Sequence, residues 1–175
     1  MRARPAFHPG EPLFAEILAL EQEHRFERLR RHGRYLHGYG VVCGLLVTAA
    51  PDPWTVRICP GYAVTPCGDE VEVCCATIVD LREKMWGRPP GAHLAWLGLR
   101  ACTEPERPAA APGKRCGCDP PHFRMSRLRE HWCLDILWDL PRDILPHADL
   151  CASGSVQCPP SAQSPYVVLA RVELP

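Results

Sequence analysis

Cysteine and histidine residues between positions 102 and 122 are the part of this sequence best suited to chemistry. Cys116 and Cys118 are followed by His122 and preceded by Cys102, which ends an apolar segment. Thiolates and imidazoles are the usual ligands of structural zinc, and Gly117 gives this stretch the backbone freedom to curl around an ion. The pattern predicts a structural zinc ion held by Cys102, Cys116, Cys118 and His122.

The same residues allow other interpretations. They could include a disulfide such as Cys102–Cys116, or they could be free thiols, because 11 cysteines cannot all pair within one chain. A cysteine elsewhere could also complete the zinc site. The alternative fourth ligands are Cys74, Cys75 and Cys158.

A catalytic zinc ion is a weaker interpretation. Catalytic zinc keeps an open coordination position and needs a general base nearby, for which Glu104 and Asp119 are the candidates. Three thiolates indicate a closed structural site instead. The sequence also contains no nucleophile elbow, phosphate loop or dinucleotide fingerprint. We therefore predict no catalytic residues and a protein that is not an enzyme.

Two further sets of polar residues have simpler explanations than chemistry. They are the histidines His24, His32 and His37 and the carboxylates Asp69, Glu70 and Glu72. The histidines lack a carboxylate at fitting spacing, so we interpret them as packing or interface residues. The carboxylates fall in a turn and on the polar side of an alternating segment, which indicates a solvated face rather than general acid–base catalysis.

The composition limits the function further. The chain has 175 residues, enough for one domain with an arm, and its 20 basic and 20 acidic residues give no electrostatic basis for binding nucleic acid or an anionic membrane. No apolar run is long enough to span a bilayer, and the first residues lack the apolar core of a signal peptide. We expect a protein made in the cytoplasm, with neither nucleic acid nor a membrane span.

A charged helix is expected near the N-terminus. Pro12 suits the first turn of a helix, and Glu21 precedes Arg25 by four residues, the spacing of a helix-stabilising pair. Apolar residues recur at roughly helical spacing over residues 13–29. We assign residues 1–40 to an extended arm followed by an amphipathic assembly helix.

The remainder, residues 41–175, is expected to form a compact β-domain. Short alternating segments separated by turn residues are typical of a small, mostly antiparallel β-sandwich or barrel. A central strand is predicted at 93–102 and another strand at 126–140. Segments rich in Pro and Cys at 103–125 and 141–165 are expected to be insertion loops. The predicted fold class is therefore α+β.

The helix, the turn after it and several later segments resemble a known bacterial family. The matching segments are EQEH (21–24), RLRRH (28–32), YLHGYGVVCGL (35–45), PGYAV (60–64), CGDEV (67–71), CTEP (102–105), CGCD (116–119) and SRLRE (126–130). In order and spacing they resemble a small family of structural proteins that accompany gene clusters for contractile, phage-tail-like injection systems. Gly33 stands where the family has Asn, and His122 stands where another Cys is expected.

The resemblance implies a structural adaptor in the baseplate or fibre-attachment region, with other tail, baseplate or fibre proteins as partners. Such a subunit would be made in the cytoplasm and then built into a particle that can be released. We expect a homo-oligomer, for which a trimer is one arrangement, formed through the N-terminal helix. The predicted assembly interface consists of Leu13, Phe14, Ile17, Leu18, Phe26, Leu29, His32, Tyr35 and His37.

A glycan-binding or cell-surface module is the remaining alternative. Small β-domains with exposed tryptophans can stack on sugar rings, and Trp86 is the tryptophan predicted to be exposed, because Gly87 and a Pro pair follow it closely. The glycine-rich turn at 36–40 is the predicted pivot between the helix and the β-domain.

Overall fold

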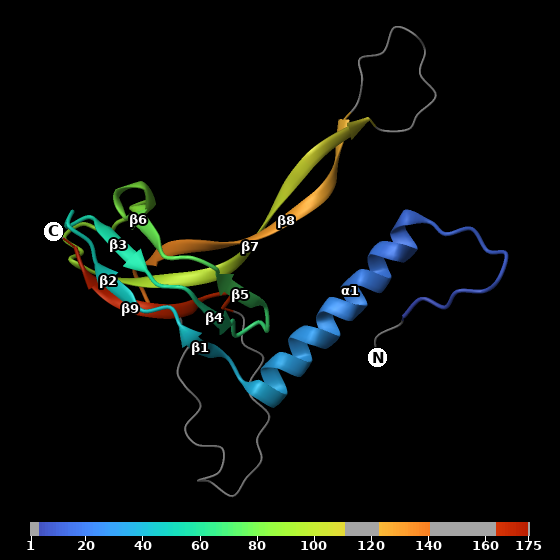
Figure 1. Ribbon diagram of the computed structural model, residues 1–175, viewed down its shortest axis with the longest axis horizontal. Helices are drawn as coiled ribbons and strands as arrows, with labels where there is room; N and C mark the ends of the chain where they lie inside the picture. The colour runs from blue at the N-terminus through green and yellow to red at the C-terminus, as the bar shows by residue number, and fades with distance from the viewer. Residues whose placement is uncertain (1–3, 111–122, 141–163, 175) are drawn as a thin grey trace, which may run out of the picture.

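A computed structural model describes residues 4–110, 123–140 and 164–174. It contains one N-terminal helix followed by three small antiparallel sheets, which confirms the predicted α+β class (Figure 1). Over the described residues these sheets do not close into a barrel. Most of the two predicted insertion loops, including all of 111–122 and 141–163, falls outside these ranges.

The predicted helix is α1 (Ala15–His32), which begins after Phe14 and is followed directly by a π-helical turn, η1 (Gly33–His37). Its last turn carries Arg30 and Arg31, cations that suit the negative end of the helix dipole. Gly38 then adopts φ 77°, a left-handed conformation that favours glycine, and the chain leaves the helix there. In Figure 1 α1 extends away from the strands and joins them only at its C-terminal end.

Two three-stranded sheets follow in the chain. The first has the order β1 (Gly40–Gly44), β4 (Gly61–Val64), β5 (Glu70–Val73), and the second has the order β2 (Val47–Ala49), β3 (Thr55–Ile58), β6 (Thr77–Asp80). All pairings are antiparallel. A short 3₁₀ turn, η2 (Arg82–Lys84), follows β6.

The apolar segment 41–49 is split between these two sheets. Leu45 is buried with φ 56°, a conformation that breaks the strand, and its amide donates to the carbonyl of Pro60. A Cβ on Gly44 would collide with the Pro60 carbonyl, and one on Gly61 would collide with that of Cys43. This close approach of Gly44 and Gly61 is the point at which the chain passes from one sheet to the next.

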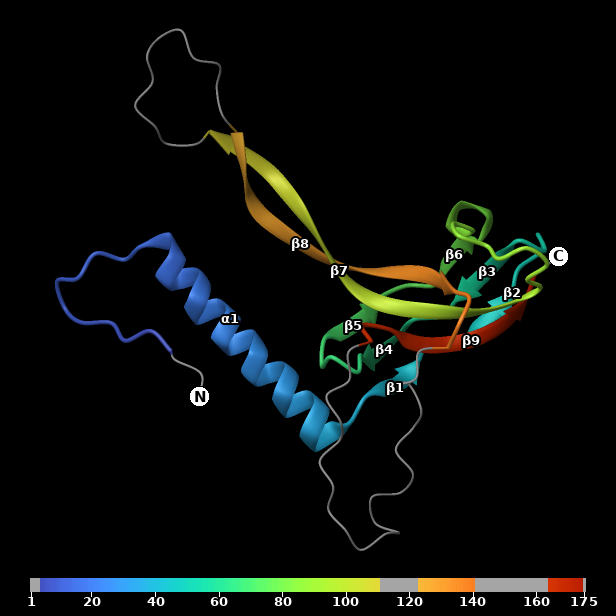
Figure 2. The same ribbon diagram turned by 180° about the vertical axis from the view of Figure 1, so that it is seen from behind.

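The third sheet has the order β8 (Phe123–Leu137), β7 (Leu94–Ala110), β9 (Val167–Glu173). Strand β7 is central, as predicted, but it continues well beyond Cys102. The prediction of a loop from residue 103 was wrong, because pairing with β8 runs from Trp96↔Leu137 to Ala110↔Phe123. Strand β9 pairs only with the first part of β7, so the rest of β7 and β8 forms a two-stranded ribbon that projects from the body (Figures 1 and 2).

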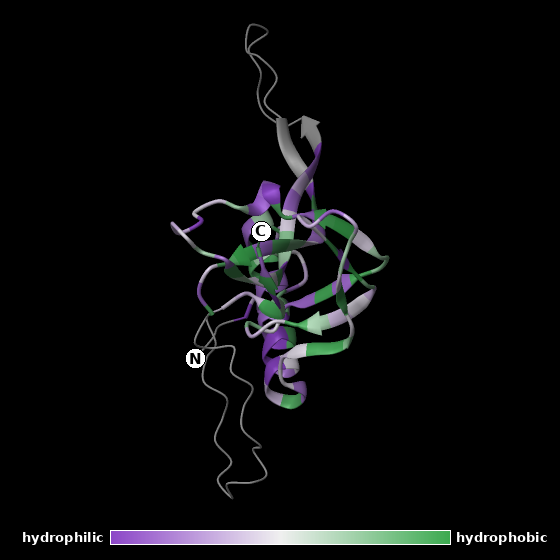
Figure 3. Cartoon of the chain, turned by 90° about the vertical axis from the view of Figure 1, so that its left-hand side faces the viewer, coloured by the Kyte–Doolittle hydropathy of each residue, from purple (hydrophilic) through white to green (hydrophobic). Residues whose placement is uncertain are grey.

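One hydrophobic core joins the three sheets. Its most deeply buried side chains include Ile58, Val73, Leu97, Leu99 and Leu134. Each such aliphatic side chain contributes about 1.5–3 kcal/mol by leaving water. Figure 3 shows the contrast with the helix, because hydrophobic colour covers much of the strands of the body whereas hydrophilic colour covers much of α1.

Candidate functional site

The surface of α1 is the first candidate site, because none of the residues of this helix is buried. Leu18 is 45% exposed and Leu29 is 64% exposed, and they lie 11 residues apart, about three helical turns, on the same side of α1. The other large exposed apolar residues on or next to the helix are Leu13, Phe14, Leu20, Phe26, Tyr35 and Leu36. All of the predicted interface residues are exposed except Ile17, which is half-buried.

The apolar residues of α1 do not form a single narrow stripe. Ile17 and Leu20 follow one side of the N-terminal half, whereas Leu18 and Leu29 follow another side. The charges are also divided along the axis. The first half, 15–23, has three acidic residues and no basic one, and the second half, 24–32, has four arginines and one glutamate.

The C-terminal end of α1 is fixed to the turn between β4 and β5. Arg30 forms an ion pair with Asp69, and the amide of Asp69 is held in turn by the hydroxyl of Thr65. The hydrogen bond to Asp69 raises the pKa of the Arg30 guanidinium. Gly68 in this turn has φ 91° and lies against the backbone of Arg30, so closely that a Cβ there would overlap it. The helix therefore has a defined direction relative to the sheets.

The histidines follow the simpler interpretation of their pattern. His32 and His37 are exposed and contact each other edge to face across η1, with ring centroids 5.4 Å apart. His24 is half-buried about two turns before His32 on α1. Among the groups of three or more potential ligands found in the described residues, none includes these histidines.

A diagonal ladder of side-chain pairs crosses β7 and β8 and is the second candidate site. Its four rungs are Arg100–Asp135, Cys102–Cys133, Glu104–His131 and Glu106–Arg129. Each residue of β7 in this ladder pairs with the residue two positions beyond its direct register partner on β8. Because strand side chains alternate between faces, the ladder lies on the face opposite the buried Leu97 and Leu99.

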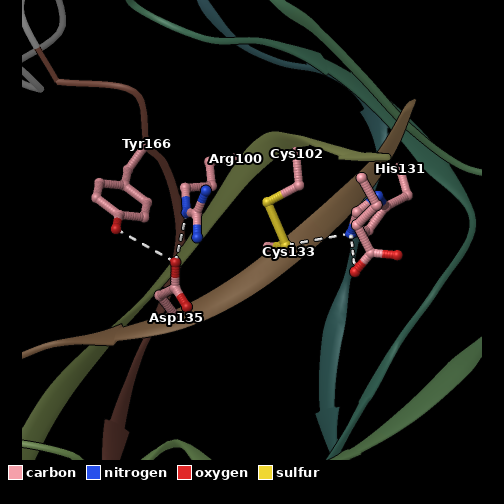
Figure 4. The surroundings of a disulfide bond; sticks show 7 residues. Arg100, Cys102, His131, Cys133, Asp135 and Tyr166 are labelled. Atoms are coloured by element: carbon pink, nitrogen blue, oxygen red, sulfur yellow. Dashed lines mark hydrogen bonds and ion pairs between the residues drawn. A yellow bond between two sulfur atoms is a disulfide. The ribbon is translucent and has the colours of Figure 1, made fainter. Parts of the chain in front are cut away.

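The rung nearest the body is a cluster of three polar groups (Figure 4). Asp135 accepts from Arg100 Nε at 2.6 Å and from the hydroxyl of Tyr166 at 3.2 Å. Burial, and then the charge of Asp135, raise the pKa of Tyr166, and the hydrogen bond to Asp135 raises that of Arg100. The neighbouring Gly98 leaves space for Tyr166 and Leu137, whose side chains a Cβ there would press at 2.8–2.9 Å.

The second rung is a disulfide between Cys102 and Cys133, whose Cα atoms are 6.0 Å apart. The predicted zinc ligands Cys116, Cys118 and His122 lie outside the described residues, so that ligand set stays a prediction. Cys102, its fourth member, is bonded to Cys133 in this structure and offers no thiolate in that form. The alternative Cys102–Cys116 disulfide is excluded by the same bond.

A different set of metal-ligand types is nevertheless gathered around this disulfide. Ligand atoms of Cys102, His131 and Cys133 all lie within 4.8 Å of one another, and these residues could hold a metal ion. His131 and Cys133 were not among the ligands predicted from the sequence. The available signal was the alternation of residues 126–140, which predicts a strand and places His131, Cys133 and Asp135 on one face.

Two of the three carboxylates and the tryptophan singled out by pattern lie where expected, whereas Asp69 is half-buried and paired with Arg30 instead of lying on a solvated face. Glu70 and Glu72 are exposed on the outer side of β5. Removal of Tyr62 from water, and then its hydrogen bond to Glu70, raise the pKa of this tyrosine to about 12. Trp86 is 92% exposed, which confirms its prediction, and its carbonyl accepts from the indole of Trp138.

Comparisons with known proteins give little. No family model matches the sequence, and no curated protein matches it. One similar solved structure is a type VI secretion system TssK-TssF-TssG baseplate subcomplex, with a TM-score of 0.45 and 12% identity. The match covers 98% of this chain and spans 56% of the length of the other, and a TM-score below 0.5 does not establish a shared fold. Within the described residues, no helix combines the length and apolar content needed to cross a bilayer.

Proposed function

We propose that this chain is a non-enzymatic structural adaptor of a contractile, phage-tail-like injection particle, which self-associates through α1. The observation that carries the proposal is the exposure of the helix, since none of its 18 residues is buried. Isolated helices of this length are marginally stable in water, and most helical stability in proteins comes from packing. A partner that covers α1 therefore completes the fold.

A second copy of the chain is the partner that the charges favour. The acidic half of α1 and its arginine-rich half are complementary when two helices lie antiparallel. Leu18 and Leu29 occupy the same side and would meet their counterparts across such an interface. The oligomer is thus held by apolar contacts and fixed in direction by charge.

The particle itself is proposed from the sequence. The segments 21–45, 60–71 and 102–130 contain the motifs that resemble structural proteins of contractile injection systems. The joint at Arg30 and Asp69 gives the helix a fixed direction, as an adaptor between a multimer and a displayed β-domain requires. The baseplate or fibre-attachment region is the position that we assign.

Light scattering coupled to gel filtration tests the self-association. We expect a multimer for the unaltered chain and a monomer-sized mass for the double variant Leu18→Glu/Leu29→Glu. Ile78→Glu is the matched control, because Ile78 is 65% exposed on β6 and away from α1. A monomer at all concentrations of the unaltered chain would refute self-association.

Charge exchange tests the direction of pairing. Glu21→Arg places a positive charge near Arg28 of the second copy and should weaken association about tenfold, and adding Arg28→Glu should restore it. The particle is tested separately by electron microscopy of purified particles with a gold-labelled tag on this chain. Label at one end of the particle supports the assigned region, and particles without label contradict it.

A further inference from the structure

Four side chains around the disulfide make a geometric arrangement that the proposed adaptor role does not use. His131 Nε2 lies 3.6 Å from Cys133 Sγ and 3.5 Å from Glu104 Oε1. Cys102 Sγ is bonded to Cys133 on the other side (Figure 4). Ligand atoms of Cys102, Cys133 and His131 therefore lie within 4.8 Å of one another on one face of the β7–β8 ribbon, and the Glu104 carboxylate approaches this group from the histidine side.

The distances from the histidine fit a tetrahedral zinc ion. Zinc bonds of about 2.3 Å to sulfur and about 2.0–2.1 Å to nitrogen or oxygen give edges of about 3.6 Å for N–S and about 3.4 Å for N–O. The corresponding distances here are 3.6 Å and 3.5 Å. The sulfur–sulfur edge is too short because a bond joins the two cysteines, and the exposed Glu104 carboxylate would have to turn toward the sulfurs to complete the tetrahedron.

The histidine lacks a good polar partner while the disulfide is present. Its Nδ1 is buried with no hydrogen-bond partner in the described part of the chain. Its Nε2 faces a sulfur, which is a weak acceptor, and a carboxylate beyond the usual N–H···O range of about 2.7–3.2 Å. A cation bound by Nε2 and the two sulfurs would give Nε2 a strong partner.

We propose that Cys102, Cys133 and His131 bind one zinc ion when the disulfide is reduced, with the exposed Glu104 carboxylate turning inward as the fourth ligand, so that disulfide and metal are alternative cross-links of the same ribbon. Two molecules of a low-molecular-weight thiol reduce the bond, giving two cysteine thiols and one external disulfide. The two thiols then release two protons to solvent and bind zinc as thiolates. This inference does not depend on the adaptor role.

The zinc ion and the disulfide would form under different redox conditions. In a reducing compartment zinc closes the ribbon, and in an oxidising one the disulfide closes it after the metal leaves. The Cα separation of 6.0 Å suits a disulfide. To bind one zinc ion, the two cysteine side chains need only rotate so that their sulfurs move apart. The ribbon therefore keeps its register in both states.

Cobalt(II) is the probe for the test, because it reports tetrahedral thiolate ligation by its absorption. The chain carries Cys43→Ser/Cys74→Ser/Cys75→Ser to remove exposed thiols, and it is reduced and freed of metal under nitrogen. We expect one equivalent of cobalt to bind with thiolate charge-transfer and intense tetrahedral bands, and zinc to displace it. The oxidised chain should give no such bands, and bands of equal strength from it would overturn the proposal.

Variants separate this site from the Cys116–His122 segment. His131→Gln should weaken binding more than about 100-fold, since even outer-shell partners of metal sites are worth about 10- to 100-fold. Glu104→Gln, at a largely exposed residue, should weaken it about tenfold without affecting the fold. Cys116→Ser/Cys118→Ser is the matched control and should retain one equivalent. Binding lost in this control and retained in His131→Gln would refute the proposal.

A thermal melt gives a second readout. The reduced chain should melt at a higher temperature with zinc than with a chelator, whereas Cys102→Ser/Cys133→Ser should melt at the same temperature in both. A zinc-dependent shift that persists in this double variant would also refute the proposal.

Discussion

Arg30 and Asp69, 39 residues apart in the chain, form an ion pair that joins the last turn of α1 to the turn between β4 and β5. Their side chains are 38% and 28% exposed, so solvent screens the pair in part. Its role is to set the direction of a helix that contributes no buried residue to the core.

A double-mutant cycle measures this pair. Arg30→Gln, Asp69→Asn and the double variant should give a coupling free energy of about 0.5 kcal/mol, because partly exposed ion pairs contribute little. High salt should reduce it. Loss of the Glu21–Arg25 pair within α1 is the control, because it should leave the hydrogen-exchange rates of the amides in the β4–β5 turn unchanged. No coupling at low salt would show that packing alone fixes the helix.

Gly68→Ala should release the helix end. Gly68 and Gly91 both have positive φ, but only at Gly68 would a Cβ overlap the backbone of Arg30, whereas Gly91 faces open space. We expect Gly91→Ala to cost about 1 kcal/mol of unfolding free energy through backbone strain, and Gly68→Ala at least about 2 kcal/mol. Urea unfolding provides the values. Equal costs for the two variants would contradict the close contact.

Tyr62 should make the fold sensitive to alkaline pH. Its pKa is about 12 in the folded state against 10.0 for an unperturbed tyrosine, so the folded chain retains a proton that the unfolded chain has lost. This contribution to stability is complete below pH 10 and is lost as the pH rises through about 12. In an absorbance titration, Tyr62→Phe should remove one tyrosine from the latest phase, and Glu70→Gln should move that phase to lower pH.

Loss of the Cys102–Cys133 bond should lower stability in the absence of metal. Closing a loop with a sequence separation of 31 is worth about 3–4 kcal/mol by chain entropy. Cys102→Ser/Cys133→Ser should therefore unfold at a lower urea concentration than the oxidised chain, with a chelator present in both samples. The exposed Cys43→Ser is the control and should leave the midpoint unchanged. Equal midpoints for the double variant and the oxidised chain would contradict this estimate.

The regular elements could be predicted because local patterns determine them. The i,i+4 charges of α1, the apolar run of β7 and the alternation around Leu134 each indicate their element directly. The switch between sheets at Leu45 could not be predicted, because no sequence pattern indicates that a leucine will adopt a positive φ. It is imposed by the crossing of Gly44 and Gly61.

The extent of the ribbon was missed because prolines argued against it. Pro105 and Pro108 read as loop residues, yet they lie on β7 beyond Leu99, where β9 no longer pairs with that strand. An open edge tolerates proline because no ladder hydrogen bond is lost there. The Cys102–Cys133 pairing depends on the register of this hairpin, so it could not be predicted once the hairpin itself was missed.

The diagonal rungs of the ribbon also have a mechanical consequence. Two-stranded ribbons are the most easily twisted of β-structures. Here four side-chain pairs, from Arg100–Asp135 to Glu106–Arg129, cross diagonally from β7 to β8 in the same direction. The disulfide is the covalent rung among them, so at Cys102–Cys133 the two strands cannot slide past each other, and the register of the hairpin is held at a point that β9 no longer supports.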